Sequence, residues 1–99
     1  MYSAVMTKKE KSARIGDLMT EYSEVRDALI LLEKEMSDLS RLFYDLAPLL
    51  RSRPEAAVER IEAELPEKSD FIAAMRRVST LRDRRDYLKN TLDQLGVKF

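Results

Sequence analysis

The sequence predicts an all-α fold: a long antiparallel helical hairpin with coiled-coil-like packing and a short connecting helix, dimerising into a helical bundle. Two observations predict it. Helix breakers are rare, since the 99 residues include two glycines and three prolines, and all the prolines lie within residues 48–66. Apolar residues also recur at alternating steps of three and four from Ile15 to Leu50, which is the spacing of a helix that packs along its whole length.

The first helix is expected over residues 7–47. Its residues are mostly strong helix formers, and Pro48 both lacks a backbone donor and disfavours helical backbone at the residue before it. The connecting helix is expected over residues 54–65, because Pro54 suits the first turn of a helix, where its missing N–H needs no partner.

The returning helix is expected over residues 69–95. Ser69 is predicted as its N-cap, and Gly96 follows the last apolar position, where a left-handed cap usually falls. Residues 1–99 are expected to form a single helical domain, because a chain of this length rarely holds two independent cores.

The apolar repeat of the first helix is read as heptads, and its core positions are called the seam. The a positions are Ile15, Tyr22, Leu29, Met36, Phe43 and Leu50, and the d positions are Leu18, Val25, Leu32, Leu39 and Leu46. The seam from Ile15 to Leu46 is the predicted interface. Five unbroken heptads indicate coiled-coil-like packing, and further apolar residues beside them widen the stripe beyond what one neighbouring helix covers.

The returning helix is expected to pack antiparallel on the first, with the Leu46 region against Phe71 and the Tyr22 region against Leu95. Local charge favours this arrangement. Residues 21–50 contain seven acids and three bases, a net charge of −4, whereas residues 69–99 contain four acids and seven bases, a net charge of +3.

A second copy is expected to complete the core. The returning helix is shorter than the first, so Ile15 and Leu18 are predicted to lack cover from their own chain. Symmetric pairs are the commonest oligomers, which favours a homodimer; a helix from a different protein is the alternative partner.

The returning helix is also rich in arginine. Arg76, Arg77, Arg82 and Arg84 could form a face that contacts nucleic-acid phosphates, although the acidic residues among them interrupt the positive charge. Pairing with the acidic first helix is the preferred interpretation, and a nucleic-acid partner is not expected.

Arg85 occupies an a position of the returning helix, where a charge requires a partner. Glu33 or Glu35 is predicted to reach it in the antiparallel register. The alternative is that Arg85 lines an anion-binding pocket.

The connecting helix carries a modest apolar stripe, formed by Ala56, Ala57, Val58, Ile61 and Leu65. We interpret it as a lid over the ends of the long helices. The alternative is a groove with Tyr44 and Leu50 that receives a helix of another protein.

Composition argues against several kinds of chemistry. The chain has no histidine and no cysteine, so the usual general base near neutral pH and the thiolate metal ligands are missing, and neither a catalytic site nor a cofactor or metal is expected. Eighteen basic and eighteen acidic residues balance. No apolar run is long enough for a membrane span, and a cytoplasmic location is expected.

These features favour a non-enzymatic protein–protein interaction module, such as an adaptor, a small chaperone or an assembly subunit, which acts through a helical surface. A nucleic-acid-associated protein that uses the arginine-rich returning helix is the alternative.

Overall fold

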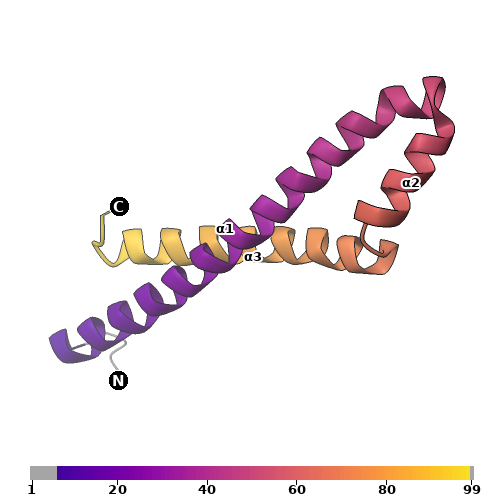
Figure 1. Ribbon diagram of the computed structural model, residues 1–99. Helices are drawn as coiled ribbons and strands as arrows, with labels where there is room; N and C mark the ends of the chain where they lie inside the picture. Colours follow the sequence, from indigo (N-terminus) through magenta and orange to yellow (C-terminus); the bar gives the residue numbers. More distant parts are fainter. Residues whose placement is uncertain (1–6, 99) are drawn as a thin grey trace. The chain divides into compact units, whose positions relative to one another are not determined.

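The computed structural model describes residues 7–98 and, within them, three helices and no strand (Figure 1). The helices are α1 (Lys8–Ser52), α2 (Pro54–Glu64) and α3 (Lys68–Gln94). The predicted all-α hairpin with a short connecting helix is therefore confirmed. The first six residues and the last residue, which the single-domain prediction included, lie outside the described part of the chain.

Helix α1 begins behind a side-chain cap and ends later than predicted. The hydroxyl of Thr7 accepts the N–H of Glu10 at 3.1 Å. Pro48 was expected to stop the helix at residue 47, but α1 continues to Ser52. Pro48 is exposed, so the hydrogen bond that it cannot make is lost on the side of α1 that faces water. Packing of Leu46 and Leu49 against α2 holds the last turns helical.

The returning helix starts one residue earlier than predicted. The carbonyl of Glu67 accepts the N–H groups of Asp70 and Phe71, at 2.9 and 3.1 Å, so Ser69 lies inside α3 and is not its N-cap. Pro54 begins α2 as expected.

The predicted left-handed cap of α3 is confirmed. Gly96 has a φ of 90°, which a residue without a Cβ adopts at little cost. The N–H of Gly96 donates to the carbonyl of Asp93 at 3.0 Å, and the N–H of Val97 reaches back to the carbonyl of Leu92 at 2.9 Å. This pair of bonds is a Schellman motif, which satisfies two carbonyls that the helix end leaves free.

The chain divides into two compact units, and α1 and α3 contribute to both. Met1–Leu29 and Thr80–Phe99 form the first, which we call the helix-pair unit; Ile30–Ser79 form the second, the three-helix unit. Whether the two fold as one domain stays a prediction.

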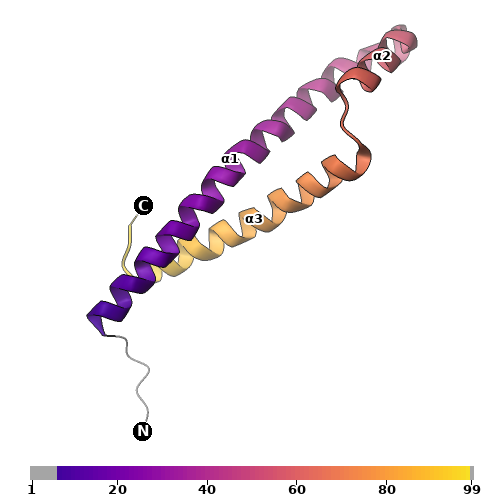
Figure 2. The same cartoon turned by 60° about the horizontal axis from the view of Figure 1, so that its bottom comes forward.

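The helix-pair unit buries Leu18, Val25 and Leu29 of α1, and Leu88 and Leu92 of α3. Figures 1 and 2 both place the C-terminal half of α3 beside the N-terminal half of α1. Leu18, which was expected to lack cover from its own chain, is only 8% exposed, so that expectation is wrong.

The register of α3 on α1 explains this cover. Tyr22 was expected near Leu95, but its neighbour Glu21 forms an ion pair with Arg84, about three helical turns earlier in α3. The last turns of α3 therefore extend further towards the start of α1 than predicted, and they shield Leu18.

The three-helix unit has a separate core, in which α2 packs on the last turns of α1. Leu42 and Leu46 of α1 are buried with Ala57 of α2. The partly buried side chains that pack around them are Leu49, Ile61 and Leu65. The predicted pairing of Leu46 with Phe71 is thus wrong, because α2 occupies the side of α1 that was assigned to the returning helix. The lid interpretation of α2 agrees with this packing.

Candidate protein-binding surfaces

The seam is covered unequally in the two units. In the helix-pair unit its a and d positions are buried or half-buried. In the three-helix unit, α2 covers the d position Leu46 and the adjacent Leu42. It leaves two a positions open, since Phe43 is 48% exposed and Leu50 is 60% exposed. The remaining seam side chains are half-buried: Ile15, Tyr22, Leu32, Met36 and Leu39.

An uncovered apolar stripe therefore follows the last turns of α1. Phe43, Ala47 and Leu50 are spaced by four and three residues, which places them on one face of the helix. We call these three residues the α1 stripe. Tyr44 is 81% exposed and lies about 100° around the helix from Phe43 and about 60° from Ala47, so it borders the stripe.

The arginines proposed for nucleic-acid contact are divided between the units. Arg76 and Arg77 are exposed in the three-helix unit, whereas Arg82 and Arg84 belong to the helix-pair unit. Nucleic-acid binding would require all four arginines to share one exposed face. Because they are divided between the two units, that shared face stays a prediction.

Arg84 already has a partner. Its Nε and Nη2 donate to the two carboxylate oxygens of Glu21, the second bond measuring 2.8 Å. The guanidinium also lies 4.9 Å from the ring centre of Tyr87, which adds a cation–π contact. This hydrogen bonding holds the pKa of Glu21 below its ordinary value of 4.5. The fork that would bind a phosphate bidentately is thus occupied.

Arg85 is half-buried, and its Nε lies 3.2 Å from Oδ1 of the adjacent Asp86. Glu33 and Glu35, its predicted partners, belong to the three-helix unit, so that pairing stays a prediction.

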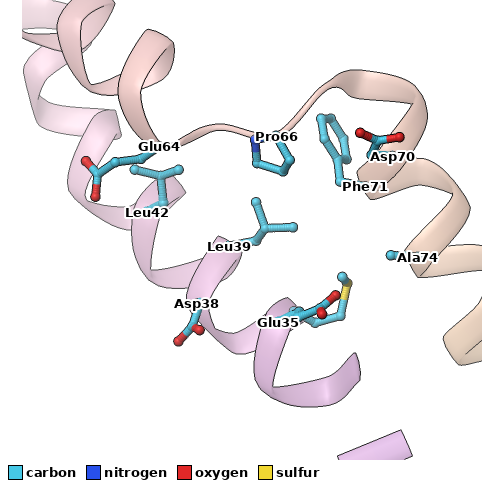
Figure 3. A pocket seen from close by; sticks show the side chains of 10 residues that line it. Glu35, Asp38, Leu39, Leu42, Glu64, Pro66, Asp70, Phe71 and Ala74 are labelled. Atoms are coloured by element: carbon cyan, nitrogen blue, oxygen red, sulfur yellow. The ribbon is translucent and has the colours of Figure 1, made fainter. Parts of the chain in front are cut away.

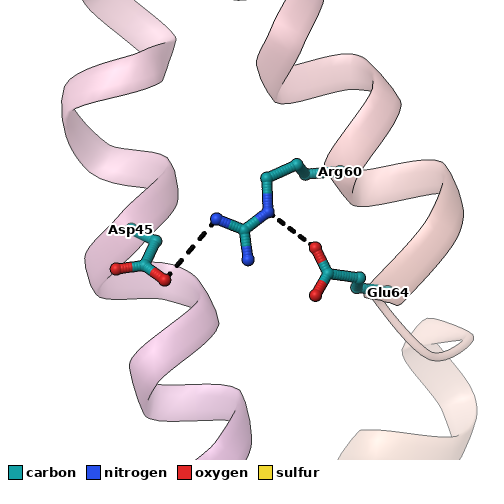
Figure 4. A network of polar contacts seen from close by, with 3 residues as sticks. All are labelled: Asp45, Arg60 and Glu64. Atoms are coloured by element: carbon teal, nitrogen blue, oxygen red, sulfur yellow. Dashed lines mark hydrogen bonds and ion pairs between the residues drawn. The ribbon is translucent and has the colours of Figure 1, made fainter.

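A polar bridge ties α2 to α1 in the three-helix unit (Figure 4). Arg60 of α2 donates through Nη1 to Asp45 of α1 at 3.5 Å and through Nε to Glu64, one turn later, at 2.6 Å. The bond from Arg60 lowers the pKa of Glu64, which keeps that carboxylate charged. The bridge fixes the end of α2 that leads into the turn before α3.

That turn closes one side of a pocket in the three-helix unit (Figure 3). The pocket has a volume of about 430 Å³. Its lining residues come from all three helices and the α2–α3 turn: Glu35, Met36, Asp38, Leu39, Leu42, Glu64, Pro66, Asp70, Phe71 and Ala74. Figure 3 shows Leu39, Pro66 and Phe71 around its middle, with carboxylates towards its edge. It therefore combines an apolar interior with an acidic surround.

The charges around the pocket are of one sign. No basic residue lines it. Glu64 is held by Arg60, whereas no hydrogen bond or ion pair within residues 7–98 involves the side chains of Glu35, Asp38 or Asp70. Sequence reasoning missed this pocket. The acidic residues were visible in the sequence, but they gather only because Pro66 turns the chain from α2 into α3.

No known protein family, curated protein or solved structure gives a significant match to this chain. Two further findings concern the described residues. None of their helices is both long and apolar enough to cross a membrane. No group of three or more acidic side chains converges among them in a way that could hold a metal ion.

Proposed function

We propose that the protein is a non-enzymatic interaction module that acts as a homodimer, with the α1 stripe at the interface. The observation that carries the proposal is the exposure of Phe43 and Leu50. These two seam positions are 48% and 60% exposed, although they continue an apolar pattern that is buried or half-buried elsewhere on α1. Removing such side chains from water is the main driving force of association.

The stripe is suited to a second copy of itself. A two-fold dimer interface must be self-complementary. When two α1 helices cross antiparallel at Ala47, the Phe43 side chain of each copy faces Leu50 of the other. The small Ala47 at the centre lets the helices approach closely. An adaptor, a small chaperone or an assembly subunit would use such a dimer as its scaffold.

The composition of the chain and the contacts of Arg84 bear on the location and on the alternative function. The absence of cysteine fits a cytoplasmic location. Nucleic-acid binding by α3 is the alternative function, and it loses support because Glu21 and Tyr87 already engage Arg84.

The dimer is tested by measuring the mass in solution over a range of protein concentrations. Phe43→Glu places a charge in the stripe, so we expect the wild type to dimerise and this variant to dissociate at least about tenfold more readily. Leu31→Glu is the matched control, because it introduces the same charge at an exposed apolar position of α1 about three helical turns away, outside the stripe, and should dimerise like the wild type.

Circular dichroism shows whether both variants keep their helices. A wild type that stays monomeric at every concentration would overturn the homodimer. Equal weakening by the two variants would exclude the α1 stripe as the interface. If the stripe binds a different protein and not a second copy, the proposed homodimer is replaced by a heteromeric complex.

A further inference from the structure

We infer that the acid-lined pocket of the three-helix unit binds a basic helical segment of another protein, which inserts one large apolar side chain between α1 and α3. The inference rests on the proposed interaction function and adds the chemistry of a partner, but it does not require the homodimer. The pocket lies wholly within one compact unit.

The apolar interior is suited to an apolar anchor. Leu39 and Met36 of α1 line one side and Phe71 and Ala74 of α3 the other, while Pro66 closes an end. A volume of about 430 Å³ falls in the range of pockets that enclose a compact ligand group. Methionine adapts its shape to different partners, which makes Met36 suitable for such a wall.

The acidic surround determines the chemistry of the occupant. Glu35 and Asp70 stand on opposite helices, and within residues 7–98 neither side chain forms an ion pair. An anionic ligand or a nucleic acid would be repelled. Lysine or arginine side chains that flank the anchor would relieve the repulsion among the carboxylates and would accelerate association at low salt.

A small cation is a poorer fit than a basic segment. The carboxylates do not converge on one point among the described residues, so they form no metal cage. A helix with basic residues three and four positions from a central apolar residue presents all of these groups on one face. Its charges can then reach Glu35 and Asp70 at separate places along the pocket edge.

The probe is a fluorescent, alanine-based helical peptide of about 16 residues, with one central leucine and lysines three and four residues to either side. Fluorescence anisotropy measures its binding to the full-length protein. We expect saturable binding that weakens as the salt concentration rises. Replacing the peptide leucine by alanine should weaken binding about tenfold, because the pocket loses its apolar contact.

The protein variant combines Glu35→Gln with Asp70→Asn. We expect it to bind the lysine peptide about tenfold more weakly than the wild type, with a smaller salt dependence. The control combines Glu55→Gln with Glu59→Gln, which removes the same charge from exposed positions of α2 that do not line the pocket. The control should bind the peptide as the wild type does.

Three outcomes would overturn the inference: no saturable binding, equal weakening by the pocket and control variants, or indifference to the peptide leucine. The mass of the Glu35→Gln/Asp70→Asn variant in solution tests whether the pocket is occupied by a second copy of the chain. If this variant no longer self-associates, the occupant is a second copy, and binding of a different protein is overturned. The Phe43→Glu variant separates the two proposals, because Phe43 does not line the pocket. If this variant is monomeric and still binds the peptide, the pocket is supported independently of the dimer.

Discussion

Helix α1 runs through both units with one unbroken heptad pattern, yet the two units bury different faces of it. In the helix-pair unit the buried positions Leu18, Val25 and Leu29 are a and d positions. In the three-helix unit the buried face is formed by Leu42 and Leu46, so the core has moved to the d edge. The neighbouring element therefore determines which edge of a wide apolar stripe is buried.

The two units also differ in how much surface they leave available for binding another molecule. In the helix-pair unit, α1 and α3 cover the seam, and Glu21 is paired with Arg84. The three-helix unit leaves apolar side chains exposed on the α1 stripe. Within residues 7–98, the pocket carboxylates of Glu35, Asp38 and Asp70 form no hydrogen bond or ion pair. Both proposed contact surfaces lie in the unit whose packing leaves more of α1 uncovered.

The largest effect is expected from truncating a side chain that is fully buried, compared with one that is half exposed. Leu88 is completely buried in the helix-pair unit, so Leu88→Ala should lower the free energy of unfolding by about 2–5 kcal/mol. Phe43→Ala, measured at concentrations where the protein is monomeric, should cost less than about 1 kcal/mol because its side chain is already half in water. Urea denaturation followed by circular dichroism measures both. Similar losses would show that Leu88 and Phe43 are equally covered.

A smaller effect is expected at the contact between α1 and α2. Ala57 is 1% exposed against Leu42 and Leu46, so Ala57→Leu overfills this core and should cost about 1–3 kcal/mol. Hydrogen exchange should show faster exchange in α2 and in the last turns of α1. Protection of residues 18–29 should be unchanged. Equal loss of protection in both units would instead show that they open as one cooperative domain.

The smallest effect concerns the ion pair of the helix-pair unit. Hydrogen bonding to Arg84 lowers the pKa of folded Glu21 below the ordinary 4.5, so the pair stabilises the fold above that pH and the contribution is lost as the pH falls through the lowered pKa. At neutral pH, Glu21→Gln should lower Tm by no more than roughly a few degrees. The difference from wild type should shrink as the pH falls below 4.5.

Glu24→Gln is the control for this pH dependence, because Glu24 lies on the same helix and is exposed. Thermal unfolding at several pH values measures both variants. A pH-dependent loss of the same size in Glu24→Gln would mean that general charge, and not the bond to Arg84, is responsible. The pKa of Glu64 is lowered by its bond to Arg60 in the wild type and in both variants, so the loss of that bond in acid is common to all three proteins and cancels from the comparison.

Features that depend on neighbouring residues in the sequence were predictable. The order of the helices, the start of α2 at Pro54 and the cap at Gly96 follow from residue propensities and backbone constraints. The apolar stripe of α1 follows from its spacing. Local rules failed at Pro48, where contacts with α2 outweigh the missing hydrogen bond, and at Ser69, where the backbone of Glu67 begins the helix instead.

The sequence by itself determined which segments are helical and that α1 carries more apolar surface than one neighbour covers. Only the tertiary structure decided the register of α3, the edge of α1 that α2 covers, and the meeting of Glu35 and Asp70 at one pocket. The physical reason is that helix formation depends on nearby residues, whereas a long repeating stripe accepts several registers of nearly equal hydrophobic gain. In the three-helix unit, the packing of α2 on Leu42 and Leu46 leaves Phe43 and Leu50 exposed.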